Sequence, residues 1–141
     1  MTVRIPVKVR YAETDRMGIV HHRNYLVWYE EARTEFSRVL GVPYAEIEGM
    51  GVVSPLLECG CKYHSSCTYG DELEVECRLV KNTPIQFEYR YRVFKKGEEK
   101  PINTGFTRHA WVDAATFRPA RLDRRLPQVY QALAQSCEPE E

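Results

Sequence analysis

Residues 25–40, YLVWYEEARTEFSRVL, carry the strongest helical pattern in the chain. Their apolar side chains recur at three- and four-residue steps, a spacing that places them on one face of an α-helix. Asn24 is a suitable N-cap residue just before the stretch, and Gly41 and Pro43 are suitable residues to end it. The pattern predicts a helix of about 16 residues, roughly 24 Å long. Its buried face would carry Tyr25, Trp28, Tyr29, Ala32, Phe36, Val39 and Leu40.

Alternation of apolar and polar residues predicts strands on both sides of this helix. Residues 3–11 alternate before it, with Val3, Ile5, Val7, Val9 and Tyr11 on one face. Four extended runs follow the helix, separated by short turns rich in Gly, Asn, Asp or Pro, a pattern typical of antiparallel hairpins. The runs are residues 52–67, with a bend near Pro55, and residues 72–81, 85–94 and 102–112. Two shorter helical segments are expected at residues 44–48 and 123–135.

One long helix and about five strands indicate the α+β class, because a curved antiparallel sheet can wrap the aromatic face of the helix. A chain of 141 residues without repeats or linkers predicts a single domain, residues 1–141. Its core would span about residues 3–115, followed by a C-terminal extension, residues 116–141. The open sheet edges favour pairing with a second copy, so a homodimer or homotetramer is expected.

Composition excludes several classes of function. Lys plus Arg and Asp plus Glu number 20 each, so no overall charge favours nucleic acid. No apolar run approaches the ~20 residues of a membrane span, and residues 1–10 lack a signal-peptide pattern, so a cytoplasmic location is expected. The five cysteines are an odd number, which argues against a closed disulfide framework and favours free thiols.

Reactive groups concentrate in residues 11–25, YAETDRMGIVHHRNY. Asp15 precedes the predicted helix start, where unpaired backbone N–H groups can hold an oxyanion. A nearby carboxylate can attack a carbonyl or activate water, which points to acyl-group hydrolysis. By spacing alone, a structural role for Asp15 as a cap or turn former is more common. Nucleophile-elbow, P-loop, dinucleotide-binding and His-Glu-x-x-His motifs are absent from the sequence.

Residues 11–33, YAETDRMGIVHHRNYLVWYEEAR, closely resemble the signature of the 4-hydroxybenzoyl-CoA thioesterase family of hotdog-fold proteins. The likeness is greatest to the branch that includes the Tol-Pal-associated acyl-CoA thioesterase, and residues 69–75, YGDELEV, extend it. The resemblance implies a long helix wrapped by a five-stranded antiparallel sheet, an acyl-CoA substrate, and neither cofactor nor metal. The matching residues are Thr14, Asp15, Gly18, Val20, His22, Asn24, Tyr25, Glu30, Ala32 and Arg33.

The resemblance also assigns roles. Asp15 matches the catalytic aspartate, either a nucleophile or a general base, and His22 matches the residue whose backbone N–H polarises the thioester carbonyl. Gly18 would let the thioester approach the turn closely. Asn24 and Tyr25, grouped here with the substrate-binding residues, would hold the loop and the helix start, as would Glu30. His21 would be a pocket or surface residue, and a helix carboxylate, Glu31 or Glu35, would take the catalytic role if Asp15 were inert.

A CoA substrate also needs cations for its phosphates. We expect Lys62, Arg90 and Arg92 to supply them, because they lie in the predicted strands. The resemblance implies that such sites form between subunits, so the choice depends on the oligomer. Further basic residues lie near or after the strands: Lys95, Lys96, Arg118, Arg121, Arg124 and Arg125.

The predicted function is hydrolysis of a small to medium acyl-CoA to a carboxylic acid and free CoA. One alternative is hydrolysis of an acyl group carried by acyl carrier protein. The other is a non-catalytic hotdog protein that binds acyl thioesters or a partner protein. Asp15 argues against the second alternative, because a binding module has no need of the carboxylate.

Overall fold

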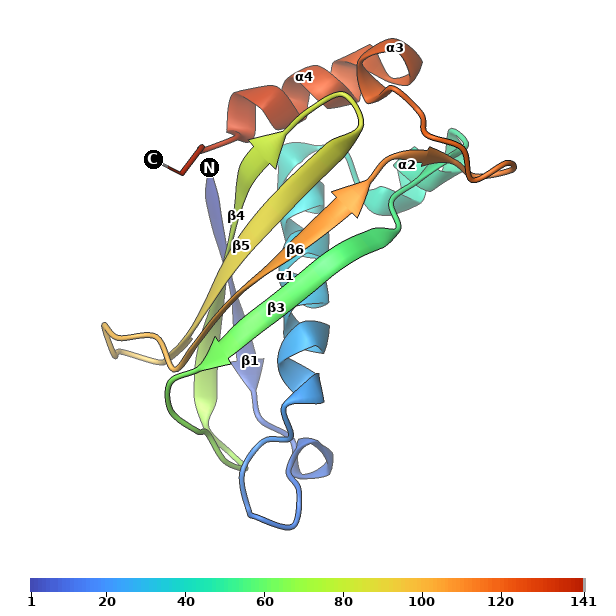
Figure 1. Cartoon of the computed structure of the whole chain (residues 1–141). Coiled ribbons are helices and arrows are strands. Elements are labelled where there is room, and N and C mark those ends of the chain that lie inside the picture. Colours follow the sequence, from blue (N-terminus) through green and yellow to red (C-terminus); the bar gives the residue numbers. More distant parts are fainter. Residues whose placement is uncertain (141) are drawn as a thin grey trace.

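One long helix lies across a face of a twisted antiparallel sheet (Figure 1). The computed structural model describes residues 1–140, so Glu141, the last residue of the predicted domain, lies outside the described residues. Neighbouring strands are antiparallel throughout, in the order β1-β4-β5-β6-β3. The α+β class and the sheet around a long helix are confirmed. The elements are α1 (Arg23–Leu40), β1 (Thr2–Lys8), β3 (Leu56–Tyr63), β4 (Glu72–Asn82), β5 (Gln86–Lys95) and β6 (Asn103–Ala110).

The core forms between the aromatic face of α1 and the inward side of the sheet. Tyr29 stacks on Tyr91 of β5 with ring centroids 4.2 Å apart, and Phe36 meets Tyr89 edge-on at 5.2 Å. Burying such a side chain contributes roughly 1.5–3 kcal/mol, so this face holds the helix on the sheet. The inward-facing residues of β4 and β5 are buried: Leu73, Val75, Cys77, Leu79, Phe87, Tyr89, Tyr91 and Val93.

The helix α1 ends at Leu40 before Gly41, as predicted, but its start and the burial of its last turn differ from the prediction. The helix begins at Arg23, whose backbone N–H donates to Nδ1 of His21 at 3.2 Å. Asn24 therefore lies inside the first turn and is not the N-cap. At the other end Val39 is 51% exposed, although it was expected on the buried face. Ser37 is buried there instead, because α2 (Tyr44–Gly49) and the C-terminal helix α4 (Pro127–Ser136) pack against α1.

The first strand ends three residues earlier than predicted. Residues Tyr11–Glu13 form a 3₁₀ turn, η1, and Tyr11 is 77% exposed rather than inward-facing. The cause is Glu13, whose Oε1 accepts the Arg10 backbone N–H at 2.8 Å and bends the chain away from the sheet. Alternation in the sequence does not reveal this bend, because a hydrogen bond from the backbone to a side chain produces it.

Two other predicted elements are divided. The run at residues 52–67 splits at Ser54 and Pro55 into β2 (Val52–Val53) and β3, and β2 pairs with β7 (Val112–Asp113) in a separate two-stranded sheet. The predicted C-terminal helix is two helices, α3 (Leu122–Arg125) and α4 (Pro127–Ser136), because Pro127 starts a new helix. Buried residues of this C-terminal region join the core beside α1: Leu122, Val129 and Leu133.

Candidate active site

Residues 14–20 form a small loop, which contains Asp15, just before α1. The amino-terminal end of α1 lies far from α3 and α4 (Figure 1). Thr14 and Val20 form an antiparallel bridge that closes the loop, and the Asp15 N–H donates to the Ile19 carbonyl at 3.0 Å. One oxygen of the half-buried Asp15 carboxylate, Oδ1, accepts the Met17 backbone N–H at 2.8 Å. Within residues 1–140 no protein donor reaches the other oxygen, Oδ2. The turn thus orients the carboxylate and leaves one oxygen available for chemistry.

Gly18 gives the loop its shape. Its φ of 81° lies in the left-handed region, which glycine adopts without steric cost. Its carbonyl accepts the hydroxyl of Thr68 at 2.8 Å, which ties the loop to the turn before β4. A Cβ on Gly18 would meet no atom within 4 Å, so backbone conformation, not space, requires glycine here. The predicted close approach of a thioester to Gly18 stays a prediction.

The two histidines at the helix start play different structural parts. Their rings stack with centroids 4.1 Å apart, and the His21 ring accepts the Arg23 N–H as described above. His21 N–H donates to the Glu13 carbonyl at 2.8 Å. The His22 N–H has no acceptor among residues 1–140. It is therefore a free backbone donor at the positive end of the α1 dipole.

A cleft of about 310 Å³ brings Asp15 and the helix start together. Tyr25 forms one wall, with its hydroxyl 3.4 Å from Sγ of Cys67. Tyr63 of β3 forms another, and its hydroxyl donates to the His22 carbonyl at 3.2 Å. Burial raises the pKa of Tyr25, and burial with a hydrogen bond from Cys61 raises the pKa of Tyr63 to about 12. Both hydroxyls stay protonated at neutral pH. The lining residues are Asp15, Met17, Ile19, Val20, His22, Tyr25, Tyr63, Ser65 and Ser66.

Behind the cleft lies a carboxylate that sequence reasoning missed. Glu13 is 3% exposed, and its Oε2 accepts the Trp28 indole N–H at 2.9 Å. Burial alone would raise the pKa of Glu13, but hydrogen bonds from Arg10 and Trp28 outweigh it and hold the pKa below its ordinary value. The carboxylate therefore ties the loop to α1 as a charged acceptor. The sequence carries no signal for the burial of Glu13, because its partner, the Trp28 indole, lies 15 residues further along the chain, in α1.

Asn24 acts on the same loop from the helix side. Its side-chain amide donates to the carbonyls of Glu13, at 2.8 Å, and His21, at 3.3 Å. Asn24 is 8% exposed and does not line the cleft, so its contacts fit the predicted role of holding the loop. Glu30, predicted to help, is exposed, and its one ion pair among the described residues is with Arg33, at 3.6 Å.

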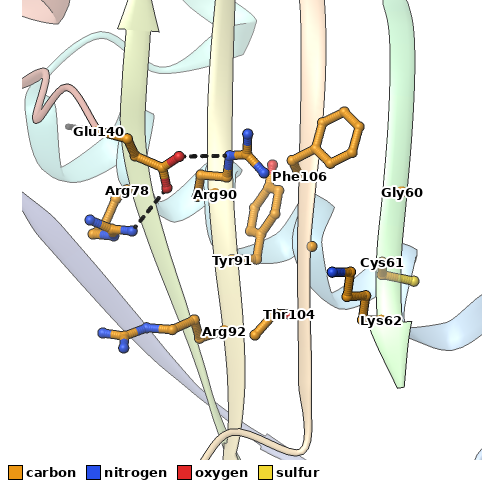
Figure 2. Close-up of a pocket in the computed structure, with 11 residues that line it drawn as sticks. Gly60, Cys61, Lys62, Arg78, Arg90, Tyr91, Arg92, Thr104, Phe106 and Glu140 are labelled. Carbon is orange, nitrogen blue, oxygen red and sulfur yellow. Dashed lines mark ion pairs between the residues drawn. The ribbon is translucent and has the colours of Figure 1, made fainter. Parts of the chain in front are cut away.

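The predicted phosphate-binding cations lie elsewhere. Lys62, Arg90 and Arg92 line a cavity of about 490 Å³ on the opposite face of the sheet, together with Arg78 (Figure 2). Lys62 and Tyr63 are consecutive on β3, so their side chains point to opposite faces. The structure therefore brings the three cations together but does not place them in the Asp15 cleft.

Within residues 1–140 no group of three or more His, Cys, Asp or Glu side chains could hold a metal ion. No helix in that range is both long and apolar enough to cross a membrane. Cys59, Cys61, Cys67, Cys77 and Cys137 are all free thiols.

The helix-wrapped sheet and the carboxylate at a helix start define the chain as a hotdog-type domain, and comparison with known proteins gives its family. Residues 9–133 match the Thioesterase-like superfamily, to which the chain belongs. The YneP protein of Bacillus subtilis (strain 168), provisionally assigned as an acyl-CoA thioesterase, is 34% identical over 126 residues, 89% of this chain and 91% of that protein. The 1,4-dihydroxy-2-naphthoyl-CoA hydrolase of Synechococcus sp. (strain RCC307) is 27% identical over 133 residues, 91% of this chain and 100% of that protein.

A solved structure agrees with these relatives. The DHNA-CoA thioesterase of Staphylococcus aureus has a TM-score of 0.91 and 33% identity, covering 95% of this chain and 89% of that chain. The predicted hotdog fold is confirmed, and the predicted thioester-hydrolase class agrees with the names of the relatives. The comparisons support the superfamily without singling out the 4-hydroxybenzoyl-CoA thioesterase family or its Tol-Pal-associated branch, which stay predictions.

Proposed function

We propose that the protein hydrolyses the thioester of a small to medium acyl-CoA to the carboxylic acid and free CoA. The observation that carries this proposal is the shared cleft of Asp15 and the amino terminus of α1. One carboxylate oxygen has no protein donor within residues 1–140, and the His22 N–H has no acceptor there. A carbonyl between these two groups would meet a nucleophile or base on one side and an oxyanion donor on the other.

The chemistry balances along either path. As a nucleophile, Asp15 forms a bond to the carbonyl carbon, the C–S bond breaks, CoA leaves as a thiolate, and water then hydrolyses the acyl-aspartate anhydride. As a general base, Asp15 accepts a proton from water while the water oxygen bonds to the same carbon; the C–S bond then breaks, CoA leaves as a thiolate, and Asp15 returns the proton to the thiolate or to solvent. In both paths the carbonyl oxygen gains negative charge beside the His22 N–H, which stabilises it. The protonated Tyr63 hydroxyl braces this segment through the His22 carbonyl.

Family membership supports the substrate class. YneP carries an acyl-CoA thioesterase assignment, and two relatives are named for a hydroxylated naphthoyl-CoA or DHNA-CoA. We therefore place aromatic acyl-CoAs beside short aliphatic ones as the first substrates to test. The cytoplasmic location predicted from the sequence stays a prediction.

The oligomer is part of the proposal. Strand β3 is an edge of the sheet, and its residues Leu56 and Leu57 are 50% and 47% exposed. Leu26 and Val27 of α1 add further exposed apolar area, at 38% and 48%. An unpaired strand edge with apolar side chains favours pairing with a second copy, so we propose at least a homodimer.

The test is thiol release from a panel of aromatic and aliphatic acyl-CoAs and acyl carrier protein thioesters. Asp15→Asn should lose roughly 10²-fold or more in kcat, the usual weight of an acid–base or nucleophilic group. Asp113→Asn is a matched control, because Asp113 also accepts backbone N–H groups in a turn, from Ala115 and Thr116, outside the cleft.

Each outcome has a distinct meaning. A folded protein inactive toward every thioester would support the non-catalytic alternative. Strong preference for acyl carrier protein would support that substrate instead. A near-normal rate in Asp15→Asn would refute the role of Asp15 and move it to a helix carboxylate.

A further inference from the structure

The outer face of the sheet holds a cavity lined by four cations and one acid (Figure 2). Arg78 of β4 and Arg90 of β5 are direct partners across the two strands. Like charges in that relation destabilise a sheet unless an anion lies between them. Lys62, on the far side of the cavity, forms no ion pair within residues 1–140. The arrangement resembles a receptor for an anion more than a network of paired surface charges.

The C-terminal tail supplies an anion to this cavity. The Glu140 carboxylate lies 3.5 Å from a terminal nitrogen of Arg78 and 3.5 Å from Nε of Arg90, as Figure 2 shows. The tail is anchored two residues earlier, where the Glu138 N–H donates to the Leu79 carbonyl at 2.8 Å and its carboxylate pairs with the Met1 amino group. The anchor directs the following residues across β4 and places Glu140 over the two arginines.

Glu140 satisfies the cavity poorly. Charge-assisted hydrogen bonds are usually about 2.7–2.9 Å, so both of its contacts are long. Arg90 Nε is buried and has no hydrogen-bond partner within residues 1–140. The ion pairs are also partly exposed, with Arg78, Arg90 and Glu140 side chains at 28%, 37% and 46%, and such pairs are weak. A ligand with more acceptor oxygens than a carboxylate could satisfy these donors better.

Other acids on this face neutralise only part of the charge. Glu76 is 2.7 Å from Arg92 and 4.0 Å from Arg78, and it also pairs with Arg4 at 2.8 Å. Glu88 pairs with a terminal nitrogen of Arg90 at 3.0 Å. These contacts hold the guanidinium groups in place, as does the Phe106 ring under Arg90 at 5.0 Å. Within residues 1–140 Lys62 has no acidic partner, and Arg90 Nε has only the long Glu140 contact, so a ligand that displaces Glu140 could use both.

We propose that this cavity binds a phosphoryl group and that Glu140 is a built-in competitor for it. Phosphate has three or more acceptor oxygens, and arginine pairs bind it in a bidentate manner. The proposal rests on the proposed function only for the natural source of the phosphoryl group, the nucleotide portion of CoA. A bound phosphate displaces the Glu140 carboxylate, and the tail is the element that moves.

Calorimetric titration of the full chain tests the proposal, with adenosine 3′,5′-bisphosphate, inorganic phosphate and adenosine as probes. Glu140→Gln removes the competing charge and should tighten binding of the bisphosphate about two- to five-fold, the range expected for an exposed ion pair. Arg90→Gln should weaken it roughly ten-fold or more, because two charge-assisted donors are lost. Adenosine, which has no phosphate, should not bind at this site.

Matched controls separate this effect from net charge and from folding. Glu98→Gln makes the same charge change at an exposed residue outside the cavity and should leave affinity unchanged. Arg78→Gln is a second cavity variant, for use if Arg90→Gln does not fold as judged by circular dichroism. Preference for the bisphosphate over inorganic phosphate identifies a nucleotide ligand, and equal affinity identifies the phosphoryl group alone; both support the proposal.

The same experiment can overturn the proposal. Absence of phosphate-dependent binding would refute the site, and equal affinity in Glu140→Gln and Glu98→Gln would refute the competition. The titrations need no turnover, so Asp15→Asn protein should bind the bisphosphate like the unmodified chain. Failure of the phosphate site and failure of the proposed thioesterase function can therefore be told apart: the titration measures the first, and the thiol-release assay measures the second.

Discussion

Replacing Glu13 by glutamine should destabilise the fold and remove part of its acid sensitivity. The Glu13 carboxylate is 3% exposed and uses both oxygens, one toward the Arg10 N–H and the other toward the Trp28 indole N–H. Glutamine has the same shape, but its amide turns an NH₂ group toward one of those donors. One hydrogen bond to a charged acceptor is lost and a buried donor is left unpaired, so Glu13→Gln should cost about 2–3 kcal/mol at pH 7.

The pH dependence follows from the direction of the pKa shift. Burial raises the pKa of Glu13, but hydrogen bonds from Arg10 and Trp28 together lower it by more than burial raises it. The pKa of Glu13 in the folded protein therefore lies below that in the unfolded chain. The carboxylate therefore contributes full stability above the unfolded pKa, about 4.3, and loses that contribution as the pH falls through the folded pKa. The stability difference between the two proteins should be constant above about pH 5 and should shrink in more acidic solution.

Urea unfolding followed by circular dichroism, repeated from pH 7 to pH 3, measures this difference. Glu31→Gln is the matched control, because Glu31 is exposed on α1 and forms no ion pair within residues 1–140; it should change stability by less than about 0.5 kcal/mol. A cost below that value for Glu13→Gln, or a cost that grows toward low pH, would show that the carboxylate does not hold the loop as a charged acceptor.

Three further predictions concern burial, close packing and the strand edge. Burial, with a smaller effect of Arg33, lowers the pKa of His109 to about 4. As the pH falls, the unfolded chain therefore takes up this proton before the folded protein does, and stability should fall by about 3 kcal/mol between pH 6.5 and pH 4. His109→Gln should remove that loss when unfolding is measured against pH. A Cβ on Gly105 would lie 2.6 Å from Cε2 of Tyr29, so Gly105→Ala should lower the free energy of unfolding in urea by about 1–3 kcal/mol. A Cβ on Gly49 would meet no atom within 4 Å, so Gly49→Ala should leave that free energy nearly unchanged. Sizing at micromolar concentration should report a dimer or larger, and Leu57→Lys on β3 should shift it toward monomer; a monomer before mutation would contradict the edge-pairing proposal.

The candidate site shows where reading from sequence succeeds and where it stops. The loop that carries Asp15 could be found because a carboxylate, a glycine and a helix start follow one another within a few residues. Tyr63 could not be found in that way, because it lies on β3 and reaches the His22 carbonyl only after the sheet has formed. Glu13 was hidden for the same reason, since its role depends on the indole of Trp28.

The grouping of cations shows a second limit. Arg90 and Arg92 were expected to bind the phosphates of CoA at a site formed between subunits, and that expectation stays a prediction. The pleat of β5 turns both side chains to the outer face, while Tyr89 and Tyr91, their neighbours in sequence, point to the core. The alternation of a strand predicts that neighbouring residues point to opposite faces of the sheet. The order of the strands then decides which other residues lie on each face.

By itself, the sequence determined the α+β class, the long aromatic helix and the position of Asp15 before its start, because periodicity and turn chemistry act over a few neighbouring residues. Only the tertiary structure decided that Glu13 is buried beneath the helix and that Tyr63 completes the cleft. It also placed Glu140 between Arg78 and Arg90. These contacts join segments far apart along the chain, and their free energies depend on burial and charge that exist only after the sheet has closed around the helix.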